Sequence, residues 1–269
     1  MSETGYTLDD LLYLMARLRD PQTGCPWDIK QDYASIAPST IEEAYEVVDA
    51  IEKQDFGHLN EELGDLLFQV IFYAQIGKEE QRFDFSSIVS SLVEKLVRRH
   101  PHVFPEGTLQ SQVSDRHNLP DDIKQRWEII KQQERASKGA HGVLDDVPVN
   151  FPALSRAAKL QKRAANVGFD WENIHGPLAK VREELIEVEE ALEQNDSEHL
   201  SEELGDLLFA VVNVVRYLKE DPEAVLRSAN RKFEKRFQYI EQQLGDQLKA
   251  ADIDTMNRLW DEAKTLKIS

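Results

Sequence analysis

The chain of 269 residues carries 50 Asp and Glu against 32 Lys and Arg, which gives a formal net charge of -18 and a pI near 4.8. This charge would repel a polyphosphate backbone, so we expect neither a nucleic-acid partner nor a basic membrane-binding face. The single cysteine, Cys25, allows no internal disulfide, and the lack of a leader-like N-terminus and of any apolar run near the ~20 residues of a membrane span predicts a cytoplasmic protein.

Apolar residues recur with a helical period along almost the whole chain, and no segment alternates for long enough to predict a strand. The pattern therefore predicts an all-α fold. We expect five helices in each half, at 7–19, 39–54, 58–79, 85–99 and 120–136, then at 153–166, 176–194, 198–219, 222–243 and 252–266.

Proline and glycine mark breaks between these helices. Pro177 follows Gly176 and suits the first turn of its helix, and Asp221-Pro222 indicates the end of one helix and the start of the next. The stretch 100–120 contains several prolines and is long for a compact helical domain, so we expect it either to move or to cover a site.

An internal repeat divides the chain in two. HLNEELGDLLFQV at 58–70 recurs as HLSEELGDLLFAV at 199–211, a displacement of 141 residues, with 11 of the 13 positions identical. We therefore expect two domains, 1–137 and 151–269, joined by a linker at 138–150. Each domain is long enough to bury its own core.

Pairs of acids three residues apart lie on neighbouring predicted helices. Residues at this spacing share one face of a helix, with Cβ atoms about 5 to 6 Å apart, so two antiparallel helices can bring four carboxylates together. The second half carries the set Glu184, Glu187, Glu203 and Asp206. The first half repeats the set as Glu43, Glu46, Glu62 and Asp65. Carboxylates this close repel one another unless cations neutralise them, which predicts a metal site in each half.

A solvated acidic face is the alternative explanation for such acids. Leu204, Leu207, Leu208 and Val211 instead predict a strongly buried second helix. Gly205 in its interior costs roughly 1 kcal/mol relative to Ala, which predicts the close approach of another backbone. Ligands that are all oxygen favour Mg²⁺ or Mn²⁺ over zinc, and Mg²⁺ commonly shares its coordination with substrate phosphates. The acids therefore indicate metal-assisted phosphate chemistry.

Candidate phosphate-binding cations follow the acids. Lys232 and Arg236 share a helical face, which suits the oxygens of a polyphosphate, although both could equally be surface charges. Lys180 lies one turn before Glu184, whereas the first half has Ser39 at that position. The remaining candidates are the first-half cations Lys95 and Arg99, the repeated pairs Trp127 with Lys131 and Trp260 with Lys264, and Trp171.

The aromatic candidates have two interpretations, because a tryptophan can stack on a nucleobase or simply fill a core. His58 and His199 begin equivalent helices. We expect these histidines to make local contacts at the helix start rather than to act as catalytic bases.

The motifs together resemble a known family. With EExxE followed by ExxD in both halves and NRKFEKRF after the second pair, the chain resembles MazG-type nucleoside triphosphate pyrophosphohydrolases over nearly its whole length. GCPWD at 24–28, RRHPHVF at 98–104 and NVGFDW at 166–171 belong to the same resemblance. It implies tandem MazG-type helical bundles, a homodimer in which helices of two subunits pack together, and Mg²⁺-dependent conversion of a nucleoside triphosphate to the monophosphate and pyrophosphate.

The resemblance also implies roles for individual residues. The Mg²⁺ ligands would be Glu184, Glu187, Glu203 and Asp206, with Glu183 nearby as a further acid or water-orienting group. The phosphates would be held by Lys232 and Arg236, and the nucleotide pocket completed by Lys180, Trp171, Asn230, Trp260 and Lys264. The first half departs from the pattern at Ser39 and at Val93, which replaces Asn230 of N-x-K-F. We therefore expect the second half to be catalytic and the first half to bind metal.

Our hypothesis for the reaction is that Mg²⁺ on the carboxylates bridges the triphosphate and directs a water at the α-phosphorus. Only the resemblance selects the α-position, since the residues themselves indicate metal-assisted phosphoanhydride hydrolysis. Two rivals belong to other classes. One is a di-iron or di-manganese carboxylate bundle, whose Glu-x-x-His signature is replaced here by acids. The other is a non-catalytic helical adaptor that binds a basic partner through its acidic surface.

Overall fold

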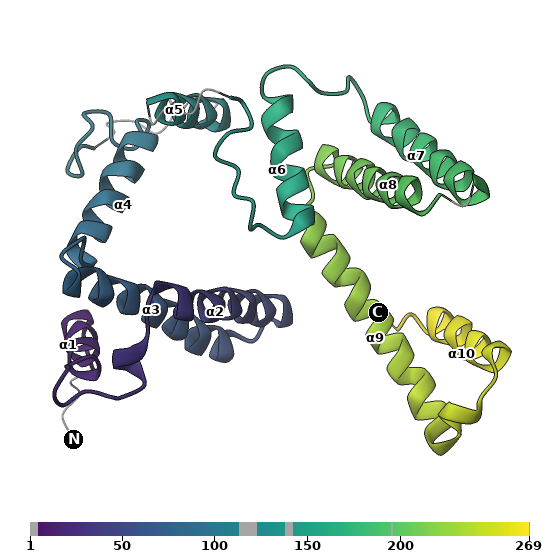
Figure 1. The fold of residues 1–269 in the computed structure, drawn as a ribbon, viewed down its shortest axis with the longest axis horizontal. Coiled ribbons are helices and arrows are strands. Elements are labelled where there is room, and N and C mark those ends of the chain that lie inside the picture. Colours follow the sequence, from purple (N-terminus) through teal and green to yellow (C-terminus); the bar gives the residue numbers. More distant parts are fainter. Residues whose placement is uncertain (1–4, 113–122, 138–141, 195, 269) are drawn as a thin grey trace. The chain divides into compact units, whose positions relative to one another are not determined.

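The computed structural model describes residues 5–112, 123–137, 142–194 and 196–268, and within these ranges all regular structure is helical (Figure 1). The all-α prediction is confirmed. The helices are α1 (Leu8–Leu18), α2 (Tyr33–Lys53), α3 (Phe56–Glu79), α4 (Phe85–Arg99), α5 (Ile123–Ser137), α6 (Ala153–Ala165), α7 (His175–Gln194), α8 (Ser197–Tyr217), α9 (Pro222–Leu244) and α10 (Ile253–Thr265), with short 3-10 segments η1 (Asp28–Lys30) and η3 (Gly245–Ala250). None of the helices in the described part of the chain is long and apolar enough to cross a membrane.

The chain divides into two compact units, Met1–Lys131 and Gln132–Ser269. The division falls within α5, a few residues before the predicted boundary at 137. Residues 113–120 of the predicted irregular stretch and 138–141 of the predicted linker lie outside the described residues. The described remainder of the linker packs on its own unit, because Arg163 Nη1 donates to the carbonyls of Val143 and Asp145 at 3.4 and 3.2 Å, and Val147 is buried.

Each helix begins where local chemistry favours it. Pro222 is the first residue of α9, and the Asp221 carboxylate accepts a hydrogen bond from the Ala224 amide at 2.8 Å, as the Asp-Pro sequence predicts. The start of α2 differs from the predicted residue 39. The Asp32 carboxylate caps that helix by accepting from the Ser35 amide at 2.8 Å, so the helix forms before Pro38 and continues through it.

The core of the first unit lies between α1, α2 and α3, where the largest fully buried side chains include Met15, Ile71 and Phe72. Beside it, Arg19 is 8% exposed and lies over the Phe72 ring at 5.2 Å.

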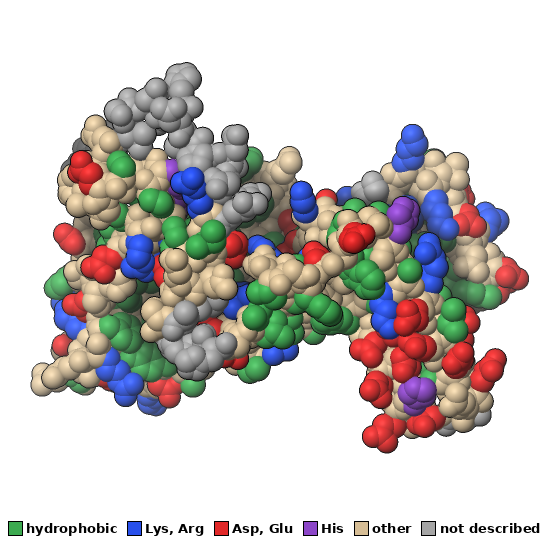
Figure 2. All heavy atoms as spheres, turned by 90° about the horizontal axis from the view of Figure 1, so that it is seen from above, with side chains coloured by type: hydrophobic (Ala, Val, Ile, Leu, Met, Phe, Trp, Pro, Cys, Tyr) green, Lys and Arg blue, Asp and Glu red, His purple; other side chains and the backbone are tan. Residues whose placement is uncertain are grey.

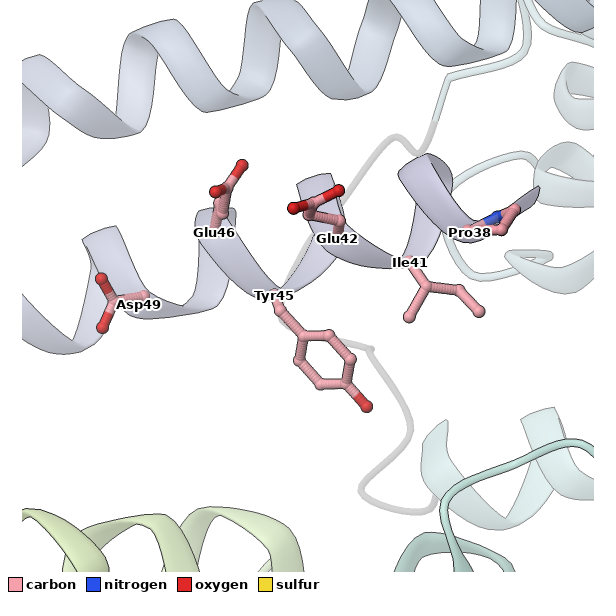
Figure 3. A pocket seen from close by; sticks show the side chains of 6 residues that line it. All are labelled: Pro38, Ile41, Glu42, Tyr45, Glu46 and Asp49. Atoms are coloured by element: carbon pink, nitrogen blue, oxygen red, sulfur yellow. The ribbon is translucent and has the colours of Figure 1, made fainter. Parts of the chain in front are cut away.

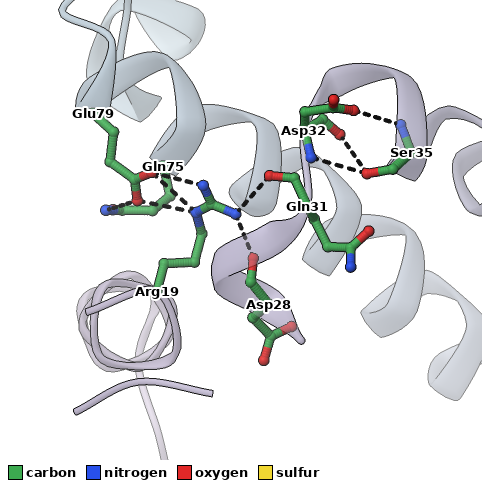
Figure 4. Close-up of polar contacts among 7 residues, drawn as sticks. All are labelled: Arg19, Asp28, Gln31, Asp32, Ser35, Gln75 and Glu79. Atoms are coloured by element: carbon green, nitrogen blue, oxygen red, sulfur yellow. Dashed lines mark hydrogen bonds and ion pairs between the residues drawn. The ribbon is translucent and has the colours of Figure 1, made fainter. Parts of the chain in front are cut away.

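A polar network around the Arg19 side chain ties α1 and the η1 segment to the end of α3 (Figure 4). Its guanidinium donates to the Glu79 carboxylate at 2.7 to 3.2 Å and to the carbonyls of Asp28 and Gln31 at 2.6 and 3.1 Å. Burial acts to raise the pKa of Glu79, but the hydrogen bonds from Arg19 and Gln75 and the charge of Arg19 together lower it. The buried guanidinium is thus charge-balanced and hydrogen-bonded.

The second unit is built around the α7–α8 hairpin, with α6 packed on α8 and α10 packed on α9 (Figure 1). Arg216 of α8 pairs with Asp170 at 2.5 Å, and the Tyr217 hydroxyl donates to the Glu172 carbonyl at 3.3 Å. These contacts hold the segment that precedes α7 against α8. The corresponding hairpin of the first unit is α2–α3.

The predicted burial of α8 is wrong for a single chain. Leu204, Leu208 and Val211 are 45%, 61% and 42% exposed. Gly205 is also exposed, and no atom lies within 4 Å of the position that a Cβ would take there, so the predicted close approach of a backbone is absent from the described chain. Periodicity identifies an apolar face correctly, but it does not specify what covers that face. Within one chain, the α8 side chains that are buried are those of Ala210 and Val212.

Candidate active site

Acidic side chains gather over the α7–α8 hairpin (Figure 2). Ligand oxygens of Glu184 and Glu187 from α7 and of Glu203 from α8 all lie within 4.8 Å of one another. Glu184 is 3% exposed. Asp206, the fourth predicted ligand, is exposed and lies outside this group. The hairpin therefore brings three of the four predicted carboxylates together within one chain.

The α2–α3 hairpin assembles a corresponding group in the first unit, which shares two of its three positions with the second. Ligand oxygens of Glu43, Glu62 and Asp65 lie within 4.8 Å of one another, and Glu62 is buried. Glu46 lies outside this group, yet its charge raises the pKa of Glu62. Both units thus hold a group of three carboxylates, drawn from the same two helices of each repeat.

Burial and mutual repulsion disfavour the charged form of these acids. The pKa of Glu43 is raised first by burial and then by the charges of Asp65 and Glu46. The pKa of Glu187 is raised first by burial and then by its hydrogen bond with Glu184. A hard divalent cation would relieve this repulsion, and three converging carboxylate oxygens are the donor set that Mg²⁺ or Mn²⁺ prefers. The residues therefore fit such an ion.

Lys180 contacts the acids of the second unit directly. Its ammonium donates to the carboxylates of Glu183 and Glu184 at 2.7 and 2.6 Å. These hydrogen bonds, that with Glu183 first, raise the pKa of Lys180. The position one turn before Glu184 thus places a cation against the buried acid, in agreement with the spacing on one helical face.

Two histidines belong to the same groups. His58 Nε2 lies 3.1 Å from the Glu62 carboxylate, and His199 Nε2 lies 3.0 Å from that of Glu203. The contacts are local, as the sequence suggests for a helix start, but their partners are acids of the two groups. The signal was the His-x-x-x-Glu spacing, which puts both side chains on one helical face and which sequence reasoning did not connect with the metal site.

The outer face of α2 carries a shallow hollow of about 520 Å³, whose lining includes the acids Glu42, Glu46 and Asp49. Figure 3 shows Glu42 and Glu46 pointing to one side of the helix, while Ile41 and Tyr45 point to the other. Glu42 is the first-half equivalent of Glu183 by the 141-residue displacement. Acids on this side of α2 are therefore accessible to a ligand from solvent.

The predicted phosphate and base contacts lie on α9 and α10. Arg236 is 5.6 Å from the centre of the Trp260 ring, and its Nε donates to the Ile268 carbonyl at 3.1 Å. Trp260 also packs against Phe233 at 5.3 Å. Lys264 pairs with Asp261 of its own helix at 2.8 Å. The structure thus brings Arg236 and Trp260 together between two helices.

Other predicted residues of the nucleotide pocket lie apart from this pair. Asn230 and Lys232 are exposed on α9. Trp171 is 44% exposed and packs on Gly176, where an added Cβ would lie 2.3 Å from its ring. No recorded polar contact between described residues links Lys232 or Arg236 to the α7–α8 acids. Within one chain, the acid group and the cations of α9 form separate clusters.

The first-unit counterparts are arranged differently. Lys131 Nζ lies 3.6 Å from the centre of the Trp127 ring and pairs with Glu128 at 3.2 Å. Lys95 and Arg99 are half-buried on α4. A lysine therefore covers the first-unit tryptophan, whereas an arginine lies over the second-unit one.

Comparison with known proteins extends the resemblance to both units. Residues 31–104 and 174–248 each match the MazG nucleotide pyrophosphohydrolase domain. The chain belongs to the MazG family. As a member of this family it is a hydrolase that acts on phosphoanhydride bonds. Both MazG matches contain a complete acid group, so the duplication is a duplication of the MazG domain.

Relatives match almost the entire chain. It is 48% identical over 266 residues to the nucleoside triphosphate pyrophosphohydrolase of Escherichia coli (strain K12), which covers 97% of this chain and 98% of the relative. It is 40% identical over 267 residues to the nucleoside triphosphate pyrophosphohydrolase/pyrophosphatase MazG of Thermotoga maritima, covering 98% of each. A Bacillus subtilis protein named YabN is 44% identical over 255 residues, which are 93% of this chain and 50% of YabN.

Proposed function

We propose that the chain is a Mg²⁺-dependent nucleoside triphosphate pyrophosphohydrolase, which converts an NTP or dNTP and water to the monophosphate and pyrophosphate. The observation that carries this proposal is the convergence of Glu184, Glu187 and Glu203 within a MazG domain. The names of the E. coli and T. maritima relatives support the substrate class and the products.

The acids of the second unit would hold the metal. Glu184, Glu187 and Glu203 supply converging oxygens, and the exposed Asp206 is free of their close packing and available to a further ion or water. When bound, Mg²⁺ neutralises these acids, screens the triphosphate charge and lowers the pKa of a water. Glu183 is exposed beside Lys180, where its carboxylate can orient the attacking water.

The cations would position the phosphates. Arg236 and Lys232 project from one helix and can bind the non-bridging oxygens, which directs the α-phosphorus towards the acids. The Trp260 ring, already in contact with Arg236, offers a stacking surface for a base. Arg236 and Lys232 would also neutralise negative charge on the pyrophosphate as it leaves.

Association of two copies would complete this arrangement. The exposed apolar face of α8, which includes Leu208, supports a homodimer because burying such a face removes apolar surface from water. Sedimentation equilibrium of the full chain tests this part of the proposal. A chain that remains monomeric at micromolar concentration under conditions of full activity contradicts it.

The proposed reaction is tested with a panel of ribo- and deoxyribonucleoside triphosphates and Mg²⁺, in which pyrophosphate and orthophosphate are measured separately. We expect pyrophosphate as the product, and no turnover after EDTA treatment. In ¹⁸O-labelled water the label should enter the monophosphate, because water attacks the α-phosphorus. Label found in the pyrophosphate instead, or release of orthophosphate alone, refutes the proposal.

A further inference from the structure

The two acid groups differ in the partner of one equivalent glutamate. In the first unit, the residue one turn before Glu43 is the neutral Ser39, and the side chain of the neutral Gln69 offsets in part the rise in the pKa of Glu43 that burial and the neighbouring acids cause. In the second unit, the equivalent Glu184 is bound by the ammonium of Lys180, and the position of Gln69 is taken by Ala210. Two positions have therefore changed together, and the exchange replaces a neutral partner by a cation.

The Lys180 ammonium lies where it competes with a metal ion. It is 2.6 Å from a carboxylate that is itself within the group of converging oxygens, and Glu184 is almost completely buried. An ammonium and a divalent cation repel each other strongly at such short range in a partly buried site. A divalent ion that enters the second group must therefore displace Lys180 from Glu184.

The first unit presents no such competitor. No lysine or arginine of the described residues forms an ion pair with Glu43, Glu62 or Asp65, and the basic side chain in contact with Glu62 is that of His58, whose Nε2 lies 3.1 Å from the carboxylate. Ligand oxygens of Glu43, Glu62 and Asp65 lie within 4.8 Å of one another, so the group needs positive charge to offset the repulsion between its acids. A divalent ion supplies that charge without displacing any lysine.

We infer that Lys180 is an intramolecular counter-ion, which keeps a divalent cation from binding the second acid group by itself and leaves Glu184 when a triphosphate offers it another anionic partner. The inference rests on the proposed function for the identity of that triphosphate. Metal and nucleotide then strengthen each other's binding in the second unit, since such coupling is reciprocal. The first unit binds its metal without a nucleotide.

A simple helical ion pair is the alternative, because lysine and glutamate four residues apart often pair on exposed helices at little gain in stability. If the Lys180–Glu184 pair were only of this kind, it would not affect metal binding to the second acid group. Two observations oppose this interpretation. The Glu184 side chain is buried, and its oxygen belongs to the convergent group. The ammonium is therefore part of the charge balance of the metal site itself.

The test is a Mn²⁺ titration of the full chain, followed by electron paramagnetic resonance of the free ion, with and without an NTP analogue whose α–β bridge is a methylene group. Without the analogue we expect one tight and one weak class of site. Lys180→Ser, which installs the first-unit residue, should tighten the weak class by about tenfold, and the analogue should tighten it by about tenfold in the unmodified chain only.

Reciprocal and conservative variants complete the design. Ser39→Lys should weaken the tight class, and Glu62→Gln should remove it, which assigns that class to the first unit. Lys180→Arg keeps the positive charge and should keep the weak class weak. Circular dichroism checks that each variant retains its helices. Because Ser39→Lys tests the same effect in the other unit, a folding defect of Lys180→Ser does not prevent a decision.

Three outcomes overturn the inference: unchanged Mn²⁺ affinities in both Lys180→Ser and Ser39→Lys, equal behaviour of Lys180→Arg and Lys180→Ser, or a tight class that survives Glu62→Gln. Turnover of NTP is measured separately on the same samples. A chain that shows the expected Mn²⁺ pattern but hydrolyses no NTP refutes the proposed function and leaves the counter-ion standing. A chain that hydrolyses NTP but lacks the pattern refutes the counter-ion alone.

Discussion

The two MazG units each bring three carboxylates together, two of which are equivalent at a displacement of 141 residues (Glu43 with Glu184, and Glu62 with Glu203), yet the units balance this charge in different ways. The first unit places a neutral Gln69 against Glu43, and the second places Lys180 against Glu184. The comparison shows that a helical hairpin is sufficient to bring the acids together. The two units differ instead in the positive charge around the acids.

The tryptophan of each unit shows a second difference. Lys131 lies 3.6 Å from the centre of the Trp127 ring, whereas Arg236 lies 5.6 Å from that of Trp260. A cation close above a ring occupies the face on which a base would stack. In the second unit the cation lies farther from the ring, and a further cation, Lys180, contacts the acid group.

The largest effect is expected from the acids. Glu203→Gln should lower kcat by about 1000-fold, because an amide removes the charge that holds the metal, whereas Glu62→Gln should lower it no more than about threefold. Pyrophosphate release at saturating Mg²⁺ and nucleotide measures both variants. Equal losses would show that the two units work as equals and would end the proposed division of labour.

The next effect concerns stability. Arg19→Ala should destabilise the first unit by about 3 kcal/mol, because it leaves buried carbonyls and a partly buried Glu79 without their partner. Arg216→Ala should cost the second unit only about 1 kcal/mol, since the hydrogen bonds of Arg216 go to the side chains of Asp170 and Asn213 and its loss leaves no buried carbonyl without a partner. Amide hydrogen exchange in the full chain measures the stability of each unit separately, in α1 and α3 for the first unit and in α8 for the second. Substitution of the exposed Arg17 by Ala provides the control. If Arg19→Ala lowered the stability of both units equally, the two units would not unfold independently.

Phosphate binding should give a smaller effect. Arg236→Ala should raise the KM for nucleotide about tenfold, because a charge-assisted hydrogen bond to a phosphate is lost. Arg99→Ala, in the equivalent helix of the first unit, should change the KM less than twofold. Steady-state kinetics measures the KM of both variants. If Arg99→Ala raised the KM as much as Arg236→Ala does, both units would bind nucleotide.

The smallest effect is expected in metal-free protein, where removing one acid should change the free energy of unfolding in opposite directions in the two units. Burial and then Glu46 raise the pKa of Glu62, so the folded state holds this proton more tightly than the unfolded chain does. The free energy of unfolding therefore falls as pH rises from the ordinary pKa of 4.5 through the raised value. Glu62→Gln should remove this fall and increase stability at pH 7 but not below pH 4.

Glu184→Gln should act in the opposite direction at pH 7, because it deprives Lys180 of a partner. The raised pKa of Lys180 means that the pair contributes stability below the ordinary lysine pKa of 10.5, which is lost as pH rises through the raised value. Urea unfolding in EDTA at both pH values measures the two variants. Stabilisation by both substitutions would contradict the difference in charge balance.

Much of the fold followed from local chemistry. The helices were predictable because caps and prolines act within a few residues, as Asp221 and Pro222 do at the start of α9. The start of α2 was missed because the Asp32 cap competes with the proline that follows it, and the sequence does not show which prevails. The apolar face of α8 was recognised, but its exposure at Leu208 was not, since a period identifies a face and not its cover.

The candidate site was predictable to the level of helical faces. Spacing predicted that Glu184 and Glu187 share a face and that Lys180 lies beside them. It did not distinguish Glu203, which joins the group, from Asp206, which does not. That difference depends on how α8 is rotated against α7, and such a rotation is a property of two packed helices together.

The sequence by itself determined that this protein is a duplicated helical chain with repeated acids at metal-binding spacing, because those features depend only on residue order and on the helical period. The tertiary structure alone decided which three carboxylates of each set converge, so that the first group takes Asp65 and leaves out Glu46, whereas the second takes Glu187 and leaves out Asp206. The physical reason is that charge balance is set by distances between side chains, and these distances are fixed only when two helices pack.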